Sequence, residues 1–217
     1  MRALTSLGWM VWGLSLVPLV IGTAVASQEK TPEEIRAFFA GKKMKVLTFF
    51  GYSGAGYEDP ASMRATASAV LDEFDPKTTI VNIGATEEGI GAVYEIAKRK
   101  GFTTTGIVST QARDQNVPLS PHVETIFFVK DDTWGGYLPD GTELSPTSRA
   151  MVENSDVLVA IGGGDVVRDE LTAARRLGKP VRFVPADMSH AAAREKAAKK
   201  GHPAPTEFDG SAAKALQ

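Results

Sequence analysis

Six short apolar segments alternate with helical segments along this chain, and this alternation constrains the fold more than any other feature. The segments expected to be strands span residues 45–50, 79–83, 104–109, 125–129, 156–161 and 181–184. Helices are expected at 31–40, 61–74, 87–100, 146–154, 165–177 and 189–200. Apolar strands that alternate with helices are typical of crossover units, in which helices cover both faces of a parallel sheet. The sequence therefore predicts an α/β fold: an open, Rossmann-like, mostly parallel sheet with helices on both faces.

The 217 residues divide into four parts by composition. Residues 1–26 combine Arg2, an uncharged apolar run and small residues up to Ala26, which is the pattern of a secretory signal peptide. We expect cleavage after Ala26 and an exported, periplasmic or secreted domain; the alternative is an uncleaved membrane anchor. Residues 27–43 are expected to form an N-terminal helix and linker, and residues 44–200 the Rossmann-like domain. Residues 201–217, rich in Pro, Ala and Gly, are expected to be a flexible tail.

The composition excludes several classes of protein. The chain has no Cys, which excludes disulfides, thiolate metal sites and thiol nucleophiles. It has 24 basic and 26 acidic side chains without a basic stripe, so we expect no nucleic-acid partner. The three His residues are far apart in the sequence, and there is neither a strict dinucleotide fingerprint nor a G-x-x-x-x-G-K-[ST] phosphate loop. We therefore expect no metal and no cofactor, and contact with a membrane only through an uncleaved leader.

Glycine-rich turns follow the first, second and fifth expected strands, at the edge where open parallel sheets bind ligands. Glycine lets backbone N–H groups approach an anion, and the following helix adds its positive end. For any one turn, the alternative is that glycine only permits a tight bend. Three such turns on one edge favour a ligand site. The candidate binding residues are Gly51, Ser53, Gly54, Gly56, Gly84, Thr86, Gly91, Ser109, Gly162, Gly163 and Gly164.

Two segments resemble the LOG proteins and the wider SLOG superfamily of Rossmann-like domains. GATEEGIGAVYEIAKRKGFTTTGIVS (84–109) is similar to the family's glycine-rich turn, helix and strand. SRAMVENSDVLVAIGGGDVVRDELTAARRLGKPV (148–181) is similar to its run of Met, strand, P-G-G-x-G-T-x-x-E, helix and L-G-K-P-V. In the LOG enzymes the resemblance implies hydrolysis of the N-glycosidic bond of a nucleoside 5′-monophosphate. It also places Glu170 on the family's catalytic Glu.

The second segment departs from the family pattern at several positions. Val166 and Val167 replace the Gly-Thr pair that offers backbone and hydroxyl groups to phosphate. Thr147 stands where the family has Arg, which makes Arg149 the candidate replacement for that cation. Asp165, in the first turn of its helix, is expected to satisfy the free helix N–H groups and so compete with a phosphate. We expect phosphate binding at this turn to be weaker than in the enzymes, or replaced by binding of a hydroxyl-rich group such as ribose.

These observations lead to three functional hypotheses. The first is an exported domain that binds a nucleotide- or nucleoside-derived small molecule at the strand ends, in a binding or sensing role. There, Trp134 is a candidate for stacking on a base or sugar, or alternatively for burial against the sheet edge. The second is a hydrolase that uses Glu170 and Arg149. The third is an interaction protein that retains the fold with a closed strand edge.

The first two hypotheses share one geometric requirement. The turns at Gly51, Gly84 and Gly162 must converge into a single open pocket with Glu170 on its wall. By analogy with related folds, which often pair, a homodimer is also expected.

Overall fold

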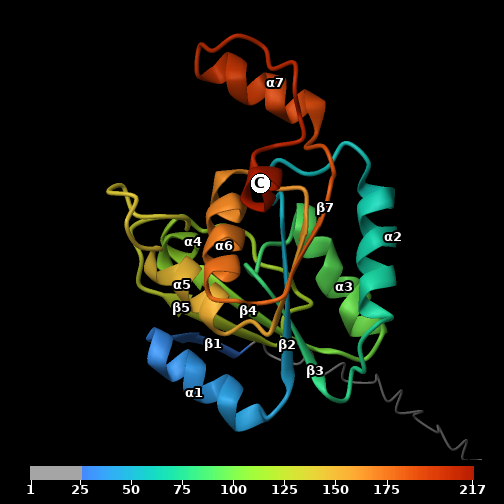
Figure 1. The fold of residues 1–217 in the computed structure, drawn as a ribbon, viewed down its shortest axis with the longest axis vertical. Coiled ribbons are helices and arrows are strands. Elements are labelled where there is room, and N and C mark those ends of the chain that lie inside the picture. Colours follow the sequence, from blue (N-terminus) through green and yellow to red (C-terminus); the bar gives the residue numbers. More distant parts are fainter. Residues whose placement is uncertain (1–25) are drawn as a thin grey trace, which may run out of the picture.

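The computed structural model describes residues 26–217, and the predicted signal peptide lies outside them except for its last residue. The fold is the predicted α/β architecture, built on one seven-stranded, wholly parallel sheet in the order β1-β5-β4-β3-β2-β6-β7 (Figure 1). No helix of this part of the chain combines the length and apolarity needed to cross a bilayer. The strands are β1 (Ala26–Glu29), β2 (Lys45–Gly51), β3 (Thr79–Ile83), β4 (Thr103–Ser109), β5 (Thr125–Val129), β6 (Val157–Ile161) and β7 (Val181–Val184).

Helices cover both faces of the sheet. On one face lie α2 (Pro60–Leu71) and α3 (Ala92–Arg99), and α3 follows a 3₁₀ turn, η1 (Gly89–Gly91). On the other lie α1 (Pro32–Lys42), α5 (Pro146–Glu153) and α6 (Asp165–Arg176), with the 3₁₀ turn η2 (Ala212–Leu216) against α6. The short α4 (Thr110–Asp114) follows β4, and α7 (His190–Lys199) stands away from the sheet (Figure 1).

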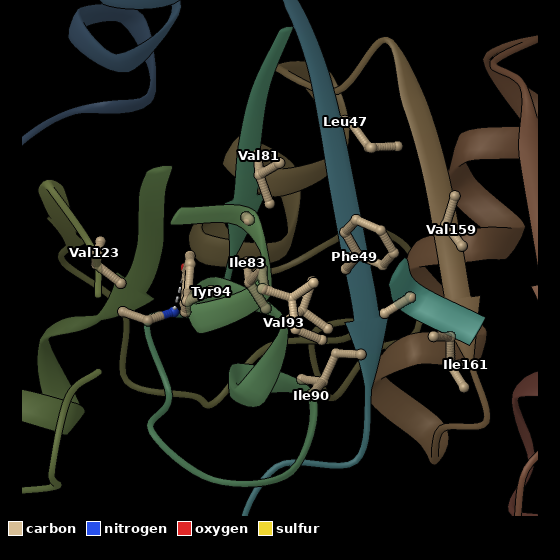
Figure 2. Close-up of a cluster of buried hydrophobic side chains, with 14 of the residues drawn as sticks. Leu47, Phe49, Val81, Ile83, Ile90, Val93, Tyr94, Val123, Val159 and Ile161 are labelled. Atoms are coloured by element: carbon tan, nitrogen blue, oxygen red, sulfur yellow. Dashed lines mark hydrogen bonds between the residues drawn. The ribbon is translucent and has the colours of Figure 1, made fainter. Parts of the chain in front are cut away.

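The core consists of two layers because alternate residues of each strand face opposite sides of the sheet. In β2, Leu47 and Phe49 belong to the layer under α2 and α3, whereas Val46 and Phe50 belong to the layer under α1, α5 and α6. Figure 2 shows the first layer, with Tyr94 of α3 between the sheet and the turn after β3. The two apolar layers explain why the strands read as nearly continuous apolar runs in the sequence.

Two segments differ from the expectation for the chain ends. Residues 27–43 were expected to hold only a helix and linker, yet Ala26–Glu29 form β1, which pairs with β5 at the sheet edge. This strand has no apolar pattern because Ser27, Gln28 and Glu29 are exposed. Part of the segment 201–217, which was expected to be a flexible tail, packs on the domain. Ala212 and Ala215 are buried against α6, and the N–H of Ala212 donates to the carbonyl of Gly163.

The strand order creates a switch point between β2 and β6. From β2 the chain proceeds through β3 and β4 to β5 on one side, then returns to place β6 and β7 on the other side. Connections leave β2 and β6 in opposite directions, which in open α/β sheets opens a crevice beyond the carboxyl ends of the strands. The turns that begin at Gly51 and Gly162 flank this position, since Gly51 pairs with Ile161.

Candidate functional site

The three glycine-rich turns do converge at the carboxyl edge of the sheet. The N–H of Ile90 donates to the carbonyl of Tyr52 at 2.7 Å, which joins the turn after β3 to the turn after β2. Beside them, the N–H of Gly162 donates to the carbonyl of Val184, so the turn after β6 is tied to β7. The turns after β2 and β3 are therefore joined, and the turn after β6 lies beside them because Gly51 pairs with Ile161.

The predicted open pocket is not present, because two tyrosines fill the switch point. The Tyr57 hydroxyl donates to the carbonyl of Ile161 at 2.8 Å and accepts from the N–H of Tyr52 at 3.2 Å. The two tyrosine rings meet edge-on with their centroids 5.3 Å apart. A Cβ added to Gly51 would lie 2.0 Å from the Tyr57 hydroxyl. Gly51 therefore makes room for a side chain of the protein itself, and burial raises the pKa of that hydroxyl.

The turn after β6 is covered from two directions. A Cβ on Gly162 would lie 2.5 Å from the Tyr52 ring, and the Tyr52 hydroxyl donates to the carbonyls of Ala186 at 3.2 Å and Phe208 at 3.4 Å. On the other side, a Cβ on Gly210 would lie only 2.3 Å from the carbonyl oxygen of Gly163. Tyr52 and the segment around Gly210 together close the place where the open pocket was expected.

Replacing Tyr57 by Phe should show how strongly this closure is held. The substitution keeps the ring but leaves the Tyr52 N–H and the Ile161 carbonyl without their partner, so we expect a loss of about 1–2 kcal/mol in the free energy of unfolding. Urea denaturation measures the loss. Tyr137→Phe is the matched control, because the Tyr137 hydroxyl only accepts from Arg176 in an exposed contact and its loss should cost less than about 0.5 kcal/mol. Equal effects of the two substitutions would contradict the assignment.

The start of α6 differs from the starts of five other helices. Side chains cap α1, α2, α4, α5 and α7, whereas Gly164 at the N-cap of α6 provides no side-chain acceptor. Among residues 26–217, no group accepts a hydrogen bond from the N–H groups of Asp165, Val166 or Val167. These amides lie at the positive end of the helix dipole, where an anion or a hydroxyl group is favoured. This helix start can therefore bind an anionic or hydroxyl-rich group.

Asp165 does not satisfy these amides, contrary to the sequence-based expectation. Its Oδ1 accepts from the Arg168 guanidinium at 2.8 Å and from the Ser211 hydroxyl at 2.6 Å. The carboxylate is thus turned away from the helix axis toward Arg168. The competition predicted between Asp165 and a phosphate for the same donors is not present in this arrangement.

Glu170, one turn further along α6, is buried rather than exposed on a pocket wall. The residue is only 5% exposed, and its Oε1 accepts a hydrogen bond from the Ser148 hydroxyl at 2.7 Å. Ser148 in turn accepts from the N–H of Gly136 at 2.7 Å. Burial raises the pKa of Glu170 to about 8; the Ser148 hydrogen bond opposes the rise, and the charge of Asp169 adds to it. Glu170 is therefore mainly protonated at neutral pH.

The loop that covers Glu170 carries Trp134. A Cβ on Gly135 would lie 2.8 Å from the Ser148 hydroxyl, so the loop backbone packs directly on the Glu170–Ser148 pair. The N–H of Tyr137 donates to Asp169 and fastens the loop to α6. Trp134 itself is 48% exposed, which excludes the alternative that it is buried against the sheet edge. Its neighbour Gly135 approaches Val166, so the loop that carries the exposed Trp134 lies beside the start of α6.

Arg149 is not brought to Glu170. Helix α5 directs Ser148 inward, whereas the next residue, Arg149, is exposed and its charge acts on Glu33 of α1. Thr147, which stands where the family has Arg, is buried, and its hydroxyl is the one buried side-chain polar atom without a hydrogen-bond partner in residues 26–217. Arg149, the candidate replacement for the family's Arg, therefore does not lie beside Glu170.

The remaining candidates divide into exposed and structural residues. Gly54 and Gly84 have open space where a side chain would begin, and Ser53 is exposed. Gly91 packs against the backbone of Thr86, where a Cβ would lie 2.0 Å from the Thr86 carbonyl oxygen. Two further residues act within the fold. Gly56 has a positive φ, and Ser109 caps α4 while donating to the carbonyl of Asp131.

A cavity lies between the start of α2 and the carboxyl ends of β6 and β7. Its volume is about 250 Å³, and its lining includes Tyr57, Met63, Thr66, Ile161 and Asp187. It lies at the edge of the sheet where the sequence predicts ligand binding, but its residues come from three separate segments without a shared motif.

The comparison with known proteins finds solved structures of low similarity to this chain. A molybdenum cofactor carrier protein from Chlamydomonas reinhardtii is 20% identical, with a TM-score of 0.47 over 64% of this chain and 76% of that one. A structural-genomics target, TM1055, is 26% identical, with a TM-score of 0.46 over 64% of this chain and 72% of that one. No family model and no curated protein matches the sequence. Because both scores are below 0.5, the Rossmann-like assignment rests on the strand order of this chain itself.

Proposed function

We propose that this chain is an exported, SLOG-like domain that binds a nucleotide- or nucleoside-derived small molecule at the start of α6, in a binding or sensing role. The observation that carries the proposal is the set of three unpartnered amides, those of Asp165, Val166 and Val167, next to the switch point of a parallel sheet. Such amides suit a phosphate or a ribose hydroxyl.

The surroundings of this helix start support a nucleotide-like ligand. The exposed Trp134 offers an aromatic face for a base, and it belongs to the loop that packs on Val166. Arg168, on the same first turn, adds a positive charge, although it is shared with Asp165 and Asp169. Export is proposed from the leader-like residues 1–26, in which Arg2 precedes an uncharged apolar run.

The hydrolase alternative is less well supported by the site. A general base must be ionised at the working pH, but burial raises the pKa of Glu170 to about 8. The backbone of Gly135 also covers the carboxyl group, and Arg149 points away from it. Base release from a nucleoside monophosphate that is lost in Glu170→Gln would restore this alternative.

Calorimetry with adenosine 5′-monophosphate, ADP-ribose and adenosine tests the proposal. We expect a binding heat for at least one of them at about 0.1 mM protein, a limit that corresponds to a binding free energy of roughly −5 kcal/mol. In Gly164→Asp, the new N-cap carboxylate should accept hydrogen bonds from the free amides and repel phosphate, so the affinity should fall by about tenfold or more. Stability should be unchanged or slightly raised, because Asp is a good N-cap.

Gly164→Ala is the matched control for the carboxylate. A Cβ on Gly164 meets no atom within 4 Å, and its φ of −94° suits alanine. This variant should therefore bind the ligand like the unaltered chain. Unchanged affinity in Gly164→Asp, or an equal loss in both variants, would remove the helix amides from the proposed site.

A further inference from the structure

The chain leaves the sheet after β7 and returns to it at the candidate site. Helix α7 has no buried residue and stands away from the sheet (Figure 1). Isolated helices shorter than about 12–15 residues are marginal in water, so α7 does little to hold this excursion in place. The chain then comes back over the start of α6 with residues 208–216, which we call the strap.

The strap is attached at the turn where the ligand is proposed to bind. The N–H of Ala212 donates to the carbonyl of Gly163 at 3.0 Å, and the Ser211 hydroxyl donates to Asp165 at 2.6 Å. Upstream, the Phe208 carbonyl accepts from Tyr52. These three partners lie in the turns after β2 and β6 or in the first turn of α6, so a ligand bound there would meet the strap. Two further hydrogen bonds hold the strap elsewhere: the Met188 N–H donates to the Phe208 carbonyl, and the Arg175 guanidinium donates to the Ala215 carbonyl.

The strap buries few apolar groups against α6, so its attachment can be reversible. The apolar groups that the strap buries against α6 are the small side chains of Ala212 and Ala215. Of its two large apolar side chains, Leu216 is 41% exposed, and Phe208 stacks on His190 at 3.9 Å between ring centroids, with Arg194 over the same ring. Both His190 and Arg194 belong to α7, so the Phe208 ring packs on the excursion and not on the sheet. The excursion itself is held at its start by polar contacts, in which the His190 N–H donates to Glu58 and the Ser189 N–H donates to the Gly56 carbonyl.

We propose that the strap is an intramolecular occupant of the ligand site, which closes the turn at Gly162, Gly163 and Gly164 until a ligand displaces it. This inference rests on the proposed function, because the ligand is the one proposed to bind at the start of α6. It accounts for the cover that Gly210 places on the carbonyl of Gly163, whereas Tyr52 and Tyr57 fill the switch point itself.

The variant Gly210→Ala tests the proposal, with Gly201→Ala as its matched control. Both glycines have a left-handed backbone, with φ of 68° and 67°, so alanine introduces the same backbone strain at either position. They differ in surroundings: a Cβ on Gly210 would lie 2.3 Å from the Gly163 carbonyl oxygen, whereas a Cβ on Gly201 meets nothing within 4 Å. Only Gly210→Ala should therefore push the strap from the turn.

Strap opening can be measured directly because the chain contains no cysteine. Ala212 is fully buried, so a thiol introduced by Ala212→Cys reacts with a soluble reagent only when the strap lifts. In this background, Gly210→Ala should raise the labelling rate about tenfold over Gly201→Ala, and saturating ADP-ribose should raise the rate in the otherwise unaltered chain. Ser211→Ala, which removes the hydrogen bond to Asp165, should raise it by a smaller factor.

The possible outcomes distinguish a failure of the strap proposal from a failure of the proposed ligand site. Faster labelling and about tenfold tighter binding of ADP-ribose in Gly210→Ala support the competition. Equal labelling rates and equal affinities in Gly210→Ala, Ser211→Ala and the control overturn it, even if the ligand binds well. If no nucleotide or nucleoside gives a binding heat in either the closed or the opened variants, the proposed function fails, and the inference that depends on it fails as well.

Discussion

Replacing Glu170 by Gln is expected to stabilise the protein by roughly 3–5 kcal/mol near pH 8 and by less than about 1 kcal/mol near pH 5. The side chain is buried and neutral in the folded chain, where burial raises the pKa to about 8 from an ordinary value of 4.5. Gln has the same shape and keeps an oxygen that accepts from Ser148. It cannot ionise, so it avoids the cost that the carboxyl group adds to folding.

The sign follows from proton binding. Between pH 4.5 and 8 the folded chain keeps the Glu170 proton while the unfolded chain has lost it. The folded state therefore binds more protons, and its stability falls by about 1.4 kcal/mol for each pH unit as the pH rises through this window. Below pH 4.5 the Glu170 carboxyl group is mainly neutral in both states, so its ionisation no longer lowers the stability of the folded chain. In Glu170→Gln this slope should be absent.

Urea denaturation of both chains at several pH values from 5 to 9 measures the effect. Glu143→Gln is a suitable control because its side chain is exposed on the same long loop that covers Glu170, and its stability should follow the unaltered chain at every pH. Parallel curves for the unaltered chain and Glu170→Gln would show that the carboxyl group is ionised when folded. That result would also return Glu170 to consideration as a general base.

The sheet could be predicted because its signal is local. Each central strand is apolar on both faces, so runs such as residues 45–50 are recognisable without knowing their partners. The edge strand β1 carries no such signal, because only one strand pairs with it and the side chains of Ser27, Gln28 and Glu29 are exposed. The strap was missed for a related reason: Ala212 and Ala215 are buried by contact with α6, and alanines in a Pro- and Gly-rich stretch do not predict that contact.

The convergence of the glycine turns could be predicted from the parallel topology, but the filling of the space between them by tyrosine side chains could not. Whether Gly51 faces a ligand or the Tyr57 hydroxyl depends on a rotamer and a neighbouring strand, and neither is written in the glycine spacing. In the same way, the phase of α5 decides that Ser148, and not Arg149, meets Glu170. A sequence motif can place residues on one helix, but a one-residue difference turns a side chain by about 100°.

Replacing Gly91 by Ala is expected to destabilise the protein by about 3 kcal/mol or more, although the residue was predicted to serve a ligand. Gly91 has a helical backbone, with φ of −60° and ψ of −23°, so intrinsic propensity favours alanine by about 1 kcal/mol. The surroundings reverse this preference. The added Cβ would lie 2.0 Å from the carbonyl oxygen and 2.7 Å from the carbonyl carbon of Thr86, and these backbone atoms cannot rotate away as a side-chain end could.

To accept the methyl group, the turn after β3 must move, and the hydrogen bond from Ile90 to the Tyr52 carbonyl would stretch or break. Gly84→Ala is the matched control in the same turn, since a Cβ there meets nothing within 4 Å; its cost should stay below about 1 kcal/mol. Thermal and urea denaturation compare the two variants. A mild effect of Gly91→Ala, equal to that of Gly84→Ala, would mean that Gly91 is not packed on the Thr86 backbone. Gly91 would then border open space, as its predicted role at a ligand site requires.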